Sequence, residues 1–247
     1  MYMSKISSGE MPELSLPISS NKADLVSIFE PYLLSSRYGY STSSEISKKL
    51  VEEIISHRSF GAAFTYEIRG KKMKWDNISS AIENLASSIY SYLTTDPFNN
   101  SNDYDSWIKK IGENFLEDCS NYASFEFGKA QKIINVTMKH LYCYNVDEKY
   151  FQFSHVALDS MTYTGRSNNS LAGGFYKCEV NPTASTKAFS NLNYEEYITV
   201  QNEIRTYLAE SKHDYIDKSG NRLTPFKAEF YFWPRYKKQG EKNDEKK

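Results

Sequence analysis

Apolar residues recur every three or four positions along most of the chain, which is the spacing of an amphipathic helix. The pattern predicts helices over 22–36, 42–57, 76–93, 103–120, 127–144 and 193–211. Ser43 or Ser44 is suited to cap the second helix, and Asp76 or Asn77 the third. Pro31 is expected to interrupt the first helix, because proline has no N–H to donate. The sequence therefore predicts a mainly α fold.

The spacing changes in residues 59–75, "SFGAAFTYEIRGKKMKW". Phe60, Ala62 and Phe64 alternate with smaller or polar residues and lead to an "RGKK" turn at 69–72. A period of two is typical of a strand, so the sequence predicts a minor β ribbon here.

The segment 224–234, "TPFKAEFYFWP", has two interpretations. As a helix it has a good N-cap in Thr224, a proline suited to the first helical position in Pro225, and a stop signal in Pro234. Its alternation of large apolar residues also fits a strand.

The ends of the chain differ in composition from the middle. Residues 1–20 are rich in Ser and Pro with few large apolar groups, and we interpret them as a flexible arm. Residues 237–247 form a charged tail, which we expect to be disordered. Residues 21–236 are expected to form a single, mainly helical domain, in which residues of about 104–144 form a helix–hairpin–helix.

Composition narrows the class of protein. The net charge of −1 does not predict a general electrostatic attraction between the chain and nucleic acid. Any DNA site must therefore be a local basic patch. Three scattered cysteines form no disulfide framework, and no window is apolar enough to span a membrane. The four histidines lack metal-ligand spacing, and no phosphate-binding loop or other cofactor motif is present. We therefore expect a soluble, cytoplasmic monomer without a metal or cofactor. The many Tyr and Phe residues either fill the core or stack on bases.

The helix predicted at 127–144 carries the candidate chemistry. On a helical wheel, Lys132, Asn135 and Lys139 fall opposite an apolar side, which predicts that both amines are presented to solvent. A helix–hairpin–helix presents backbone N–H groups at the start of its second helix, where the dipole attracts phosphate. This geometry is suited to a DNA backbone.

These residues resemble the helix–hairpin–helix DNA glycosylases, the superfamily of endonuclease III and the 8-oxoguanine glycosylases. Lys132 precedes Asn135 by three residues, and Asp159 follows the apolar segment "HVAL". The closing "PFKAEFYFW", which ends at Trp233, also looks like the final helix of these enzymes. The resemblance implies that Lys132 is the amine nucleophile and that Asp159 stabilises the sugar cation. It implies base flipping from double-stranded DNA, with possible lyase activity.

The expected DNA contacts come from the hairpin and from nearby basic residues. They are Gly128, Lys129, Asn135, Lys139, His155, Lys71 and Lys72.

Each candidate also has a simpler interpretation. Lys132 is also interpretable as an ordinary solvated lysine, Asp159 as the cap of a segment that starts at Ser160, and His155 as a hydrogen-bonded packing residue. If these simpler roles hold, the chain is a non-enzymatic helical module that binds a protein or nucleic acid. The distance between Lys132 and Asp159 in the folded chain distinguishes the two functions.

Overall fold

The computed structural model describes residues 19–34, 46–64, 78–120, 125–144, 146–163, 175–180, 187–210 and 215–244. It is mainly helical, as predicted. Its α-helices are α1 (Lys22–Leu34), α2 (Lys48–Ile54), α3 (Phe60–Ala63), α5 (Ser79–Leu93), α6 (Ser101–Cys119), α7 (Phe127–Tyr142), α8 (Tyr194–Glu210) and α9 (Pro225–Asp244). Shorter helical turns are η1 (Ile55–Ser59), η3 (Glu148–Phe151), η4 (Tyr176–Val180) and η5 (Phe189–Asn191).

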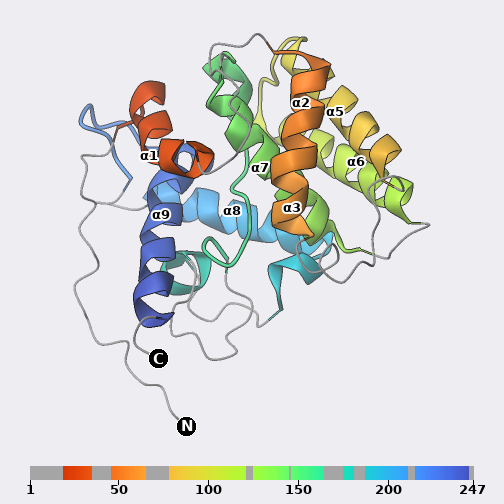
Figure 1. Cartoon of the computed structure of the whole chain (residues 1–247). Coiled ribbons are helices and arrows are strands. Elements are labelled where there is room, and N and C mark those ends of the chain that lie inside the picture. Colours follow the sequence, from red (N-terminus) through yellow and green to blue (C-terminus); the bar gives the residue numbers. More distant parts are fainter. Residues whose placement is uncertain are drawn as a thin grey trace.

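Helix α7 lies at the centre of the fold (Figure 1). It packs against α2, η1, α3 and α6 on one side and against α8 and η5 on another, while α1 packs on α9. Thirteen of its sixteen residues are buried. A helix in this position has no broad solvent face, so its polar side chains need partners inside the protein.

The predicted β ribbon is wrong at its start. Residues Lys48 to Ala63 form one continuous helical stretch through α2, the π-turn η1 and α3. Phe60, Ala63 and Phe64 are buried, and this is the i, i+3, i+4 spacing of a helix. The described ranges contain no strand, and the rest of the predicted ribbon, residues 65–75, lies outside them.

Helix boundaries differ from the predictions in several places. Ser47 caps α2 and accepts a hydrogen bond from Leu50 N, whereas the predicted caps Ser43 and Ser44 lie outside the described residues. Helix α1 continues past Pro31 to Leu34.

Helix α9 begins at Pro225, as predicted, and Lys227 N donates to Thr224 Oγ1 at its start. The helix continues through Pro234 to Asp244, so neither the predicted stop nor the predicted start of the disordered tail at 237 is correct. A proline removes one helical hydrogen bond and leaves the others in place, so a helix anchored on the core is able to continue past it.

The last residues of the predicted arm are attached to the domain. Ser19 N donates to Tyr231 Oη at 2.7 Å, and Ser20 Oγ donates to Asp217 Oδ2 at 2.5 Å. Residues 1–18 lie outside the described part of the chain.

The aromatic residues build the core. The largest fully buried side chains are all Tyr or Phe, and they belong to a single hydrophobic cluster that extends from Leu25 to Phe232. Tyr92 packs against Phe98 and Trp107, and Phe175 stacks on Phe232 with ring centroids 4.0 Å apart. The core therefore accounts for these rings.

Within the described ranges, no helix has both the length and the apolar character needed to cross a membrane.

Candidate functional site

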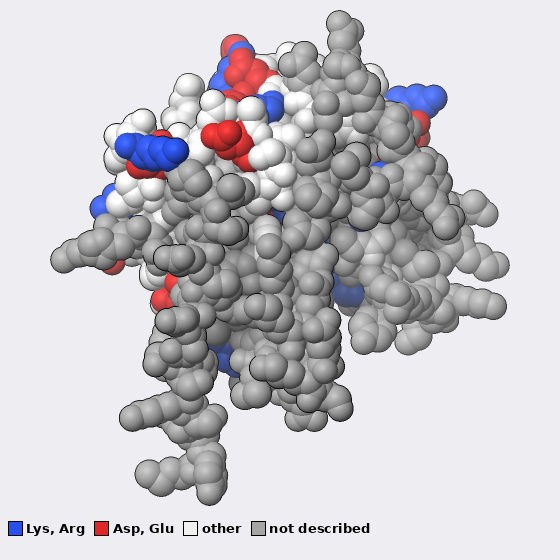
Figure 2. All heavy atoms as spheres, turned by 60° about the vertical axis from the view of Figure 1, so that its left-hand side comes forward, with Lys and Arg blue, Asp and Glu red and all other residues white. Residues whose placement is uncertain are grey.

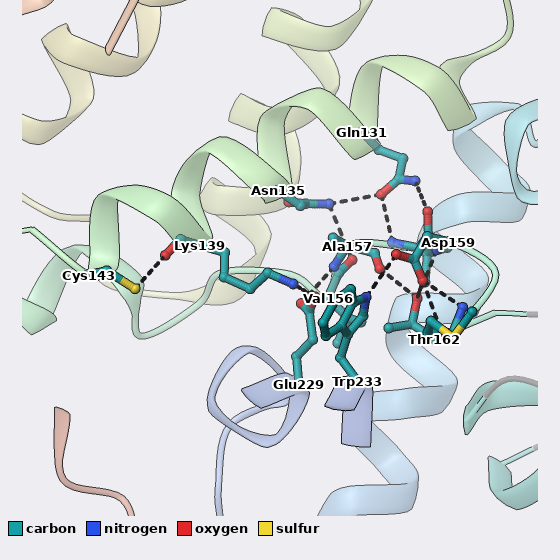
Figure 3. Close-up of polar contacts among 12 residues, drawn as sticks. Gln131, Asn135, Lys139, Cys143, Val156, Ala157, Asp159, Thr162, Glu229 and Trp233 are labelled. Carbon is teal, nitrogen blue, oxygen red and sulfur yellow. Dashed lines mark hydrogen bonds and ion pairs between the residues drawn. The ribbon is translucent and has the colours of Figure 1, made fainter. Parts of the chain in front are cut away.

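A buried segment without helical structure, residues 155–159 "HVALD", lies between α7 and α9 and forms the framework of the site (Figure 3). His155 to Leu158 are each at most 1% exposed. Buried N–H and C=O groups cost free energy unless they are hydrogen-bonded. In this segment side chains of the surrounding helices supply most of those bonds.

Two amides of α7 bind this segment in register. Gln131 Nε2 donates to Leu158 O at 2.9 Å, and Gln131 Oε1 accepts from Leu158 N at 3.2 Å. One helical turn later, Asn135 Nδ2 donates to Val156 O at 3.3 Å. Four helical residues rise about 6 Å, and two extended residues span about 6.6 Å, so an antiparallel segment meets one amide per turn.

The neighbouring helices bind the same segment from other sides. Gln201 of α8 accepts from Val156 N at 3.1 Å and donates to Val156 O at 2.9 Å. Glu229 Oε2 of α9 accepts from Ala157 N at 2.9 Å, and Thr162 Oγ1 donates to Ala157 O at 2.6 Å. Three helices thereby fix the backbone that leads to Asp159.

Asp159 follows this segment and is held by three donors. Its Oδ1 accepts from the backbone N–H groups of Met161 (2.7 Å) and Thr162 (3.0 Å), so Asp159 closes a turn, and the helix that it was predicted to cap from Ser160 is not formed. Its Oδ2 accepts from Trp233 Nε1 at 3.0 Å. Burial favours the neutral acid, but the charge of Lys132 and these donors outweigh it and lower the pKa of Asp159. The carboxylate is therefore ionised at neutral pH.

Lys132 of α7 interacts electrostatically with this carboxylate. The side chain is half-buried, and its Nζ lies 4.9 Å from the ring centroid of Phe189. Among the described residues, Nζ has neither a hydrogen-bond acceptor nor an ion-pair partner within bonding distance. Burial lowers the pKa of Lys132, and the charge of Asp159 partly opposes that shift. The fold thus brings the two predicted catalytic residues into electrostatic contact.

The predicted polar face of this helix is wrong for two of its three residues. Asn135 is 1% exposed and Lys139 is 4% exposed, so neither is presented to DNA. Asn135 binds Val156 O, and Lys139 Nζ forms a buried ion pair with Glu229 Oε1. A helical wheel identifies polar positions, but it contains no information on which other elements cover them.

Gly128 does not offer a free phosphate site. Its N–H donates to Leu192 O at 2.8 Å. A Cβ atom at this position would lie 1.8 Å from Phe189 O, so glycine is required for the close approach of η5 to α7. The predicted phosphate contact at Gly128 is therefore wrong, because that N–H is already used.

Lys129 packs on aromatic rings beside the start of α7. Its Nζ lies 4.8 Å from the ring centroid of Phe64 and 5.3 Å from that of Phe125. These contacts leave its proposed contact with DNA untested. Lys71 and Lys72 lie outside the described residues.

His155 is a packing residue, as the simpler interpretation held. Its Nδ1 lies 2.5 Å from Tyr197 Oη and its Nε2 lies 2.6 Å from Asp105 Oδ1, which also binds Arg205. Burial lowers the pKa of His155 to about 4, although Asp105 opposes the shift. The ring is 1% exposed, so the predicted contact with DNA is wrong.

Charged residues and cavities also occur on the described surface outside the site at Lys132 and Asp159. On the face in Figure 2, the described basic and acidic residues are interspersed. A cavity of about 630 Å³ is lined by Ser20, Asp24, Asp217 and Tyr231 among others, and neither Lys132 nor Asp159 contributes to it. Within the described ranges, no group of three His, Cys, Asp or Glu residues is arranged to hold a metal ion.

Most residues that build the framework have no recognisable signal in the sequence. Gln131, Gln201 and Glu229 were not predicted as site residues. The available signal was the i, i+4 row of Gln131, Asn135 and Lys139 along the helix.

Comparison with protein-family models, with curated proteins and with solved structures found no match for this chain. The resemblance to the helix–hairpin–helix glycosylases therefore rests on the sequence features around Lys132, Asn135 and Asp159.

Proposed function

We propose that the chain is a DNA N-glycosylase with lyase activity, in which Lys132 is the nucleophile and Asp159 stabilises the sugar cation. The observation that supports this most is the combination of a half-buried amine without a bonded partner and an ionised carboxylate beside it. A structural lysine at such a place is expected to form an ion pair, as Lys139 does with Glu229.

The chemistry requires a neutral amine. At the ordinary lysine pKa, only roughly one amine in 2500 is neutral at pH 7. Burial lowers the pKa of Lys132 and so increases that fraction. Among the described residues, no hydrogen bond or ion pair fixes the amine of Lys132 in one orientation.

The carboxylate and the amine act on the same carbon. As the bond from C1′ to the base breaks, its electron pair leaves with the base and positive charge develops on the sugar. Asp159 stabilises that charge, and Lys132 Nζ forms a bond to C1′. One amine proton then passes to O4′ as the bond from C1′ to O4′ breaks and its electron pair leaves with O4′. The nitrogen lone pair forms the C=N bond of an iminium ion that keeps the second proton, and this protonated Schiff base is the species from which strand cleavage proceeds.

Borohydride trapping tests this proposal. The protein is incubated with duplexes that each carry one modified base, with an unmodified duplex and with an abasic duplex, in the presence of sodium borohydride. Borohydride reduces the iminium ion to a stable amine, so protein and DNA migrate together on a denaturing gel. We expect an adduct with at least one modified duplex, and we expect Lys132→Ala to abolish it.

Two further variants make the result specific. Lys110→Ala removes an exposed lysine of α6 and is expected to trap as the wild type does. Asp159→Asn keeps an oxygen that can accept from Met161 N and Thr162 N, and it is expected to abolish base release while the protein stays folded. Adducts that persist in Lys132→Ala contradict the assignment of the nucleophile. Binding of DNA without any adduct is the result expected of a non-enzymatic helical module.

A further inference from the structure

The buried ion pair between Lys139 and Glu229 requires an explanation beyond stability. Its side chains are 5% and 1% exposed. Removing two charges from water costs about as much as their attraction returns, and an apolar pair of the same volume is often as stable. A core position on α7 that carries an ammonium group is therefore better explained by what the charge does.

Both members of the pair lie beside the candidate site. Lys139 comes seven residues after Lys132, which is about two helical turns, so both side chains leave α7 on neighbouring sides. Lys139 Nζ lies 5.2 Å from the ring centroid of Trp233, whose indole N–H is bonded to Asp159. Glu229 Oε2 accepts from Ala157 N, two residues before Asp159.

Four charged groups act on the Lys132 amine in the described part of the chain. Asp159 has the largest effect and favours the protonated amine, as Glu229 does to a smaller degree. Lys139 and Lys129 are positive and favour the neutral amine. These groups come from α7, from the segment that ends at Asp159, and from α9.

We propose that the Lys139–Glu229 ion pair is a positioning element that sets the protonation state of Lys132, with its two members acting in opposite directions. Lys139 opposes the proton on Lys132, and Glu229 limits that effect while it keeps Lys139 from pairing with Asp159. The role of this ion pair in catalysis rests on the proposed function. Its effect on the pKa of Lys132 does not depend on that function.

The inference predicts that the two single variants shift the pKa of Lys132 in opposite directions. Glu229→Gln leaves an unpaired ammonium near Lys132, so the pKa of Lys132 is expected to fall. Lys139→Met removes the positive charge that favours the neutral amine, so the pKa of Lys132 is expected to rise. The double variant Lys139→Met with Glu229→Gln removes both charges and is expected to lie between them. If the ion pair serves packing alone, each single variant is expected to be less stable, and the two variants are not expected to shift the pKa of Lys132 in opposite directions.

The measurement uses the lysine amine directly. Reductive methylation with ¹³C-formaldehyde labels the lysine amines, and the NMR signal that is missing in Lys132→Arg identifies Lys132. Its chemical shift is then followed against pH in the wild type and in each variant. The matched control is Lys109→Met with Glu195→Gln, which removes an exposed ion pair between α6 and α8 with side chains 39% and 77% exposed. This control is expected to leave the titration of Lys132 unchanged.

The outcomes separate this inference from the proposed function. Shifts of the same sign in both single variants, or no shift in either, overturn the inference even if borohydride traps an adduct. Opposite shifts without any trapped adduct support the inference and contradict the proposed function. Where Lys139→Met does not fold, as judged by its melting curve, Glu229→Gln and the double variant decide: the inference requires a lower pKa of Lys132 in Glu229→Gln than in the double variant.

Discussion

Replacing Gln131 by methionine tests how the framework of the site is held. Methionine has nearly the volume of glutamine and fits a buried helical position without a cavity. The change removes both hydrogen bonds between Gln131 and Leu158, whose N–H and C=O have no other partner among the described residues. The effect therefore isolates hydrogen bonding from packing.

The expected loss follows from the count of buried backbone groups left unpaired. Each such group costs about 1–3 kcal/mol, so the N–H and C=O of Leu158 together cost about 2–6 kcal/mol. Gly128 O also loses a bond from Gln131 Nε2, but Lys132 N remains available to it within the helix. Against a total stability of about 5–15 kcal/mol, the loss is large enough to measure and small enough for the variant to fold in most of that range.

Urea unfolding followed by circular dichroism measures this loss. We expect a lower midpoint with an unchanged slope, because the surface exposed on unfolding stays the same. Gln152→Met is the matched control, since Gln152 is exposed and its change is expected to stay within about 0.5 kcal/mol. A free energy of unfolding for Gln131→Met that equals that of the control would refute the reasoning.

Two further predictions concern packing and pH. Gly128→Ala places a Cβ atom 1.8 Å from Phe189 O, against 3.4 Å or more for an ordinary contact, so we expect a loss of about 1–3 kcal/mol in urea unfolding. Gly61→Ala on α3 has nothing within 4 Å and is expected to be neutral or stabilising; similar losses for both would contradict this explanation. The pKa of His155 is lowered to about 4 in the folded chain, so the unfolded chain takes up the proton first as the pH falls. The contribution of His155 to the free energy of unfolding is therefore expected to decrease by up to about 3 kcal/mol between about pH 6.5 and about pH 4, and His140, whose pKa burial lowers to about 3, acts in the same direction. A free energy of unfolding that stays constant over that window would contradict both assignments.

The spacing of apolar residues predicted the helices, because a helix that is buried on one side has apolar residues every three or four positions. The stripe of Leu50, Ile54 and Ile55 is buried as expected. The failures occur where local signals conflict or are overridden. Alternation suggested a strand at 59–64, yet the positions that are actually buried have helical spacing, and Pro234 did not end a helix that the core already holds.

The candidate site was predictable only in part, for the same reason. Lys132 and Asp159 were predicted from the resemblance to the helix–hairpin–helix glycosylases, and in the structure the two groups interact electrostatically. The partners of the buried polar residues come from α8 and α9, which are distant in sequence, and no local pattern links Gln201 or Glu229 to residues 156 and 157. Long-range pairing of this kind depends on the packed fold.

The row of polar residues along α7 explains why one lysine of this helix is a candidate for chemistry and another is not. Gln131, Asn135 and Lys139 repeat every four residues and thus lie along one line, where each meets the buried segment or its partner on α9. Lys132 is rotated by about 100° from Gln131 but only about 20° from Lys139, and among the described residues its amine makes no hydrogen bond to the segment. Its amine is half-buried, as the packing of α7 requires, but no structural bond among the described residues occupies it. The side chains of the row are held by partners in the buried segment or on α9, whereas the Lys132 amine has no hydrogen-bond or ion-pair partner among the described residues and interacts electrostatically with Asp159.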